Sequence, residues 1–173
     1  PEIVSYITKK LGLELCLNYV RGEPLEKEAK DIKLKDYNKT WDKLVQINEV
    51  NSKKGFHESL IRALNNLSSK LIVKTLNGKK RTVKCVTGTK QIEIAEDGTI
   101  FPCEMMNVNY GNIRDFDYDI KKVLDSDKAK RFTKQIERMK CHCTWECAMK
   151  NNIVYNPKQY PSLILEWVKL FLT

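Results

Sequence analysis

Hydrophobic residues recur at helical spacing through most of this 173-residue chain, and a few stretches of other patterns interrupt them. Residues 3–11 follow a helical period that ends at Gly12, and residues 13–20 then form an apolar run typical of a buried strand. Cys16 lies inside this run, so we expect it to be a small buried hydrophobic residue and not a ligand. The polar residues 21–24 form a loop after the strand.

Two amphipathic helices are predicted in the next part of the chain. Asp36 is a suitable N-cap for the first helix, and Gly55 separates it from the second. The second helix begins near His57 and ends, or turns tightly, at Asn77 and Gly78. Its apolar face is formed by Leu60, Ile61, Leu64, Leu67 and Leu71.

Residues 81–103 change to an alternation of polar and apolar positions, most clearly between Gln91 and Ala95. The pair Asp97-Gly98 provides the positive φ that a tight hairpin turn requires. A second strand follows and ends at Pro102, because proline has no N–H to donate to a strand ladder. This pattern predicts a β-hairpin.

Helices are predicted again after the hairpin and a loop at residues 110–113. One begins near Asp117 or Asp119, and either Ser126 or Asp127 caps the next. The predicted fold class is therefore α+β, mostly helical, with one small antiparallel hairpin.

The last segment, from Pro161 onward, is apolar on most of its sides and must pack against another surface. A swapped homodimer is one arrangement that would cover it. No stretch approaches the ~20 apolar residues needed to span a bilayer, so we expect no membrane partner. The chain opens on Pro1 without a secretory signal, which predicts a fragment of a longer cytoplasmic protein. In that compartment cysteines serve metal binding or catalysis more often than disulfides.

The chain is basic, with 31 Lys and Arg against 22 Asp and Glu and a formal charge of +9. The charge is spread along the sequence, and the longest basic run, at residues 79–84, is more typical of a solvated turn than of a phosphate-binding patch. A nucleic-acid-binding domain needs a basic stripe with exposed aromatic residues. The aromatic residues here mostly occupy apolar helix faces, so we expect no nucleic-acid partner.

Five cysteines in the second half of the chain are candidate metal ligands: Cys85, Cys103, Cys141, Cys143 and Cys147. Cys85 precedes the hairpin and Cys103 ends it, and paired strands lie ~4.8 Å apart, so these two can meet at the open end. The other three follow an amphipathic helix that can dock them there. Cys143 and Cys147 are four positions apart, so a helical turn would place both on one face.

Four of these thiolates could surround one metal ion or cluster, and thiolates select zinc or an iron–sulfur cluster. Zinc favours ligand pairs two to four residues apart, whereas a single residue, His142, separates Cys141 from Cys143. An iron–sulfur cluster accepts more varied spacing because its ligands bind different irons. His142 is a substitute ligand between two better ones. A structural zinc module in an interaction protein is the alternative.

The spacing of Cys85, Gly98 and Cys103, followed by the closing group at 141–147, resembles the C-terminal half of a radical SAM enzyme with a SPASM or twitch-type auxiliary cluster domain. The resemblance covers about the last half of the chain. It implies an auxiliary 4Fe–4S cluster with Cys85, Cys103 and Cys147 as ligands, and Cys143 or Cys141 as the fourth. The closing group is shorter than the full SPASM pattern, which holds two clusters, and suffices for one.

The resemblance also implies a division into a barrel end (1–35), a helical linker (36–80) and a cluster domain (81–173). The barrel end would be a remnant strand–helix unit of a partial (β/α)6 barrel. Arg21, in the loop after its strand, would contact S-adenosylmethionine or substrate, or anchor the loop through a carboxylate. The family's catalytic three-cysteine motif is absent, so no catalytic residue is predicted and the chain alone would be inactive.

In such an oxidoreductase or maturase, S-adenosylmethionine binds the N-terminal barrel of the parent polypeptide. The resemblance implies that the auxiliary domain binds substrate, often a peptide, or passes an electron.

Overall fold

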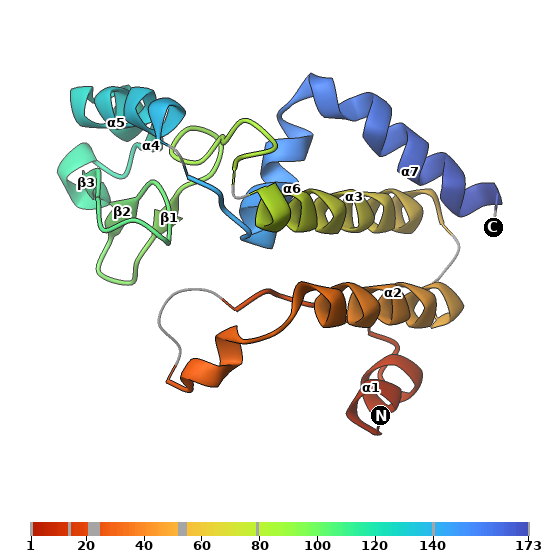
Figure 1. Cartoon of the computed structure of the whole chain (residues 1–173). Helices are drawn as coiled ribbons and strands as arrows, with labels where there is room; N and C mark the ends of the chain where they lie inside the picture. The colour runs from red at the N-terminus through yellow and green to blue at the C-terminus, as the bar shows by residue number, and fades with distance from the viewer. Residues whose placement is uncertain are drawn as a thin grey trace. The chain divides into compact units, whose positions relative to one another are not determined.

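The computed structural model describes residues 2–13, 15–20, 25–51, 55–78, 80–139 and 141–172 (Figure 1). The chain divides into two compact units, which we call the helical unit (Pro1–Val73 with Pro161–Thr173) and the cysteine unit (Lys74–Tyr160). Helices predominate, with one small antiparallel sheet, and this confirms the predicted mixture of α and β structure. Among the described residues, no helix is long and apolar enough to cross a membrane.

The helical unit contains the helices that the apolar periodicity predicts and one short 3-10 turn that it did not predict. Its elements are α1 (Glu2–Ser5), the π-helical turn η1 (Tyr6–Lys10), the 3-10 turn η2 (Lys27–Lys30), α2 (Leu34–Asn51), α3 (Phe56–Gly78) and α7 (Tyr160–Leu172), with α3 and α7 each extending across a unit boundary. The end of α3 at Gly78 confirms the predicted stop. The prediction of Asp36 as N-cap is wrong, because α2 already begins at Leu34. Asp36 instead lies in the first turn, where a carboxylate interacts favourably with the helix dipole.

The predicted buried strand at 13–20 is wrong for residues 15–20, which form no regular secondary structure. A strand requires a neighbouring strand, and among the described residues none lies beside this segment. The side-chain amide of Asn48 takes that place, accepting the N–H of Leu15 at 3.2 Å and donating to its carbonyl at 2.9 Å. Cys16 is exposed, which corrects the expectation that it is buried. The barrel remnant stays a prediction.

The cysteine unit contains a three-stranded antiparallel sheet in the order β1-β2-β3. Its elements are β1 (Glu93–Ile94), β2 (Thr99–Phe101), β3 (Gly111–Asn112), η3 (Ile113–Phe116), α4 (Ile120–Asp125), α5 (Asp127–Arg138), α6 (Glu146–Val154) and η4 (Pro157–Gln159). Glu93 pairs with Phe101 and Ile94 with Ile100, so β1 and β2 form the predicted hairpin. The third strand lies where a loop was predicted.

The hairpin turn has the chemistry that its sequence predicts. Gly98 adopts φ +87°, and its N–H donates to the carbonyl of Ala95 at 2.9 Å. The Asp97 carboxylate accepts the N–H and the hydroxyl of Thr99, each at 2.8 Å. These two bonds, the backbone bond first, lower the pKa of Asp97. The second strand ends at the residue before Pro102, as expected.

Side-chain caps begin the helices that follow the sheet. The Asp119 carboxylate accepts the N–H of Lys121 at 2.8 Å at the start of α4. Ser126 accepts the N–H of Ala129 at 3.2 Å at the start of α5. Of the alternatives that the sequence left open, Asp119 and Ser126 are therefore the caps.

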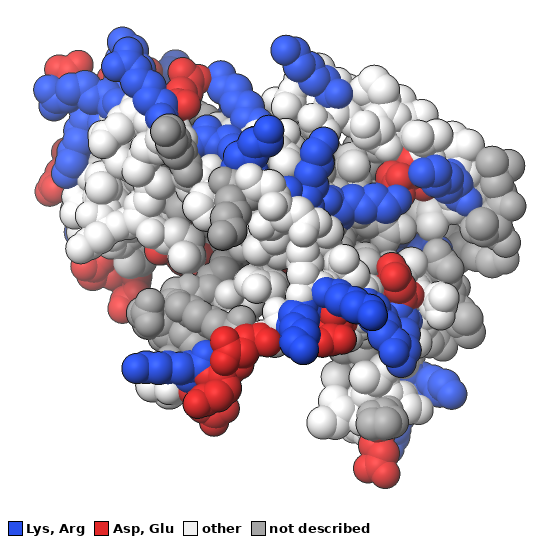
Figure 2. Space-filling view, viewed as in Figure 1, with Lys and Arg blue, Asp and Glu red and all other residues white. Residues whose placement is uncertain are grey.

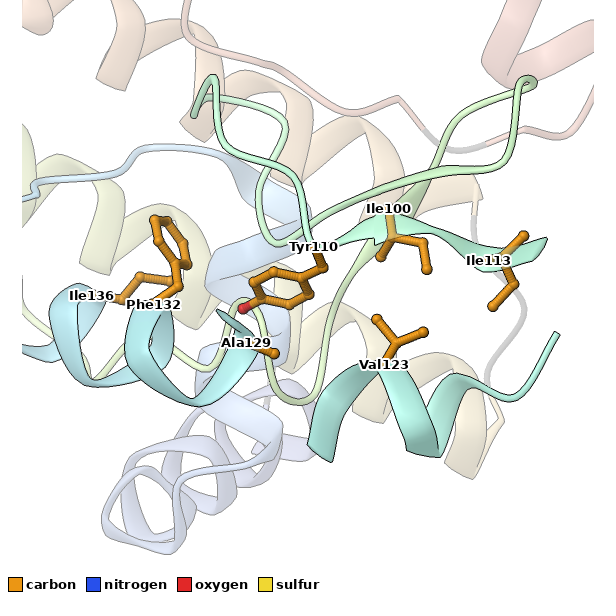
Figure 3. Close-up of a cluster of buried hydrophobic side chains, with 7 residues drawn as sticks. All are labelled: Ile100, Tyr110, Ile113, Val123, Ala129, Phe132 and Ile136. Carbon is orange, nitrogen blue, oxygen red and sulfur yellow. The ribbon is translucent and has the colours of Figure 1, made fainter. Parts of the chain in front are cut away.

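The hydrophobic core of the cysteine unit lies between the sheet and the helices α4 and α5 (Figure 3). Ile100 on β2 and Ile113 at the start of η3 point toward Val123 on α4, and the ring of Tyr110 points toward α5. The other core residues are Ala129, Phe132 and Ile136, all on α5. Ile100 and Val123 are fully buried, so this core anchors both the hairpin and the helices.

Candidate metal centre

Cys103 lies in a tight turn at the end of the hairpin. The turn closes through a hydrogen bond of 3.2 Å from the N–H of Met106 to the carbonyl of Cys103. Pro102, which precedes it, is fully buried, and only 9% of Cys103 is exposed. The sheet and this turn therefore hold the thiol in a fixed place.

Burial raises the pKa of the Cys103 thiol, because a desolvated thiolate is less stable than a thiol. The backbone N–H of Met105 acts in the opposite direction by donating a hydrogen bond to the sulfur. The charges of Cys85, Cys141 and Glu104 raise the pKa further. The structure thus brings Cys85 and Cys141 close enough to Cys103 for their charges to act on it.

Cys85 is half-buried and packs against the hydrophobic core of the cysteine unit. The N–H of the next residue, Val86, donates to the side-chain oxygen of Asn152 at 2.8 Å. Asn152 lies on α6 and is only 4% exposed. A second amide on α6, Asn151, donates to the side chain of Gln91 at 2.9 Å. Helix α6 therefore fixes the segment that carries Cys85.

Arg81 joins the beginning of the cysteine unit to the segment that carries Cys141. Its Nη2 donates to the carbonyls of Ile136 and Met139, each at 2.9 Å, at the end of α5. Its Nε donates to the carbonyl of Cys141 at 3.4 Å. The prediction of a solvated turn for this basic run is therefore wrong at Arg81, which caps a helix C-terminus.

The closing cysteines are arranged differently from the prediction. Helix α6 begins at Glu146, so Cys143 precedes the helix and Cys147 lies in its first turn. The prediction that one helix face carries both is wrong. Cys143 is half-buried, and its sulfur accepts the N–H of Trp145 at 3.3 Å. Cys147 and His142 are exposed.

Two of the cysteines accept hydrogen bonds of the same kind. The sulfurs of Cys103 and Cys143 each accept a backbone N–H from the residue two positions further on, Met105 and Trp145. Such bonds stabilise the thiolate and, in metal centres, tune the metal through its sulfur ligands. The donor chemistry therefore fits a centre with thiolate ligands.

In the described part of the chain, no three Cys, His, Asp or Glu side chains are gathered in an arrangement that could hold a metal ion. The assignment of Cys85, Cys103, Cys141, Cys143 and Cys147 as ligands therefore stays a prediction. Arg21 lies outside the described residues, and its contact with cofactor or substrate stays a prediction as well.

Sequence reasoning missed the two side chains that position the cysteine segments, Arg81 and Asn152. Each bonds to backbone far away in sequence, at separations of 55 and 66 residues. A local pattern contains no signal for such bonds.

A turn holds the Cys103 thiol, helix α6 holds the segment that carries Cys85, and Arg81 holds the segment that carries Cys141. Residues 85–148 match the SPASM family, described as an iron–sulfur cluster-binding domain. The matched segment begins at Cys85, includes the other four cysteines and lies within the cysteine unit. The chain therefore carries a SPASM-type domain, as the cysteine spacing predicts. Comparisons with curated proteins and with solved structures gave no match.

Proposed function

We propose that the cysteine unit is the auxiliary domain of a radical SAM enzyme and binds one 4Fe–4S cluster through four of its five candidate cysteines. The observation that carries this proposal is the family match, which begins at Cys85 and spans all five. Two further observations support it. The charges of Cys85 and Cys141 raise the pKa of the Cys103 thiol, and the sulfurs of Cys103 and Cys143 each accept a backbone N–H hydrogen bond. The division into a barrel end, a linker and a cluster domain belongs to the same proposal.

Cys85, Cys103 and Cys147 are the proposed constant ligands. For the fourth, different observations support Cys141 and Cys143. The charge of Cys141 raises the pKa of the Cys103 thiol, and Arg81 donates a hydrogen bond to the carbonyl of Cys141. Cys143 accepts an N–H bond at its sulfur. Substitution of each cysteine in turn decides between them.

A bound cluster would supply one-electron transfer, and the residues of this chain would hold it and limit its contact with water. The domain would serve an oxidoreductase or maturase by binding its substrate, a peptide in this proposal, or by passing an electron. S-adenosylmethionine would bind an N-terminal barrel in the parent polypeptide, where Arg21 would contact the cofactor or the substrate. A reducing cytoplasm would keep the thiols available for iron.

The test is anaerobic reconstitution of the full chain with iron and sulfide, followed by analysis of both elements and visible absorption. We expect about four irons per chain and a brown protein. Replacing Cys85, Cys103 or Cys147 by serine should each remove most of the iron, whereas only one of Cys141→Ser and Cys143→Ser should do so.

Cys16→Ser is the matched control, because Cys16 is an exposed cysteine outside the matched segment. It should bind as much iron as the unsubstituted chain. A colourless protein that binds one zinc tightly and rejects iron under these conditions would favour the structural zinc module. Loss of iron in Cys16→Ser would show that the iron is not held at a specific site.

A further inference from the structure

An open groove lies beside the turn that holds Cys103. Its cavity volume is about 600 Å³, which is within the range of ligand sites. The lining residues come from the hairpin (93–96 and Phe101) and from the turn (104–107). Ile94 and Met105 are each 49% exposed, so the groove presents apolar side chains to its occupant.

One side of the groove is lined by β1, which is an edge strand of the sheet. β1 pairs only with β2, so its other side is open among the described residues. Ile94 lies opposite Ile100, whose carbonyl already accepts the N–H of Tyr110 from the β3 side at 2.7 Å. In an antiparallel ladder, such a pair is the non-hydrogen-bonded kind. The N–H and carbonyl of Ile94 therefore point away from β2, toward the open edge.

The charge of the groove is opposite to that of the chain. Glu93, Glu96 and Glu104 line it, and none of its lining residues is Lys, Arg or His. All three glutamates are exposed, and in the described part of the chain no ion pair neutralises them. Elsewhere in the same unit, Lys and Arg gather near α5, with Asp and Glu among them (Figure 2). A cationic ligand is therefore attracted to this groove.

We propose that this groove binds an extended peptide segment bearing Lys or Arg, which adds to β1 as a further strand. Backbone hydrogen bonds to Ile94 would hold the segment, as in other cases of strand addition. Basic side chains would face the glutamates, and an apolar side chain would contact Met105. This inference rests on the proposed function in one respect, since a cluster on Cys103 would lie one residue from the Glu104 wall.

Two other occupants fit the observations less well. A metal ion would need the three carboxylates to converge, and the described residues contain no such group. A second copy of the chain, paired through β1, would bring Glu93 and Glu96 of both copies together, and like charges across a strand pair are destabilising.

The test uses the reconstituted full chain and a fluorescent peptide of alternating Lys and Val. Binding is followed by anisotropy, and exchange of the Ile94 amide is followed by NMR. We expect the peptide to bind, to lose affinity at high salt and to slow exchange at Ile94. A peptide with Glu in place of Lys should not bind. One with Pro in place of the central Val should bind more weakly, because it lacks an N–H donor.

The variants Glu93→Gln, Glu96→Gln and Glu104→Gln should each weaken binding about 1.5-fold to 5-fold, as expected for exposed ion pairs. The triple variant should weaken it roughly tenfold or more. Asp115→Asn and Asp125→Asn, exposed carboxylates of the same unit outside the groove, are the matched controls and should have no effect.

Equal affinity in the triple variant, or unchanged exchange at Ile94, would overturn the inference. Spermidine that competes as well as the peptide would identify a small-cation site instead, and dimerisation through β1 would identify a second copy. Iron measured on the same sample separates the two proposals. Iron without peptide binding refutes only this inference, and peptide binding without iron refutes only the cluster.

Discussion

The two compact units of this chain are held together in different ways. In the cysteine unit, polar side chains bond to backbone at the points where the chain changes direction, as Asp97, Ser126 and Asn152 do. In the helical unit, the helices pack against one another, but large apolar residues on their other faces stay exposed, such as Phe56 at 69% and Ile164 at 57%. The comparison teaches that specific hydrogen bonds place the cysteine segments, so single polar substitutions should matter more in that unit.

The largest difference in the loss of unfolding free energy is expected between substitutions at core positions of the two units. Ile100→Ala should lower the free energy of unfolding of the cysteine unit by about 2–5 kcal/mol, because Ile100 is fully buried in its core. Leu60→Ala on α3 should cost about 1 kcal/mol, since Leu60 is 37% exposed. Hydrogen exchange along a urea series reports each unit separately. Equal losses would show that the two units are equally well packed.

Glycines with positive φ should show the next largest difference. A Cβ at Gly88, where φ is +82°, would lie 2.5 Å from the hydroxyl of Tyr110. Gly88→Ala should therefore cost roughly 2–4 kcal/mol from backbone strain and overpacking together.

Gly12, where φ is +64° and no atom lies within 4 Å of the added carbon, is the matched control in the helical unit. Gly12→Ala should cost only the backbone strain, about 1–2 kcal/mol. Thermal unfolding of the two variants measures the difference. A smaller loss for Gly88 would contradict the close packing of the Tyr110 hydroxyl.

Each unit has an asparagine that holds an irregular segment, and their substitution compares the two directly. Asn152→Ala removes the buried partner of the Val86 N–H and should cost about 1–3 kcal/mol. It should also lower the iron content after reconstitution, because the segment of Cys85 loses its anchor.

Asn48→Ala removes two bonds to Leu15 at a more exposed site and should cost about 1 kcal/mol. Its iron content should not change. Iron analysis beside urea unfolding tests both variants. Equal iron loss in the two would show that the effect of Asn152 is not local to the cysteine centre.

The smallest expected effect is the loss of stability at acidic pH that comes from Glu166. Burial acts to raise the pKa of Glu166, but hydrogen bonds from Lys70 at 2.5 Å and Lys169 at 3.0 Å outweigh it and lower the pKa below the ordinary 4.5. A lowered folded pKa stabilises the helical unit above the unfolded pKa, and this stability is lost as the pH falls through the folded pKa. Glu166→Gln should remove about 1 kcal/mol at neutral pH and flatten this acid dependence.

Asp97 in the cysteine unit also has a lowered pKa, mainly because of hydrogen bonds from the neutral N–H and hydroxyl of Thr99, with a smaller effect from the charge of Arg114. Salt at about 1 M should therefore weaken the contribution of Glu166 more than that of Asp97. Acid unfolding at low and high salt, followed by hydrogen exchange in each unit, measures this. The same salt response in both units would contradict the assigned causes.

Several elements could be predicted because their signals are local. The hairpin turn follows from Asp97-Gly98, the strand end from Pro102, and the α5 start from Ser126, since each acts on backbone within a few residues. The third strand at Gly111–Asn112 could not be predicted, because its two residues become a strand only by pairing with β2. The strand prediction for residues 15–20 was wrong for the opposite reason, since an apolar run without a described neighbouring strand forms no ladder.

The sequence by itself determined the helices, the hairpin and the cysteine spacing that the family match confirms at residues 85–148. Only the tertiary structure decided which side chains place the cysteines. Arg81 reaches the carbonyl of Cys141 across 60 residues, and Asn152 reaches the N–H of Val86 across 66. The physical reason is that a local sequence pattern affects only the backbone of residues within a few positions of it. A hydrogen bond between distant residues depends on a packed core that first brings them together.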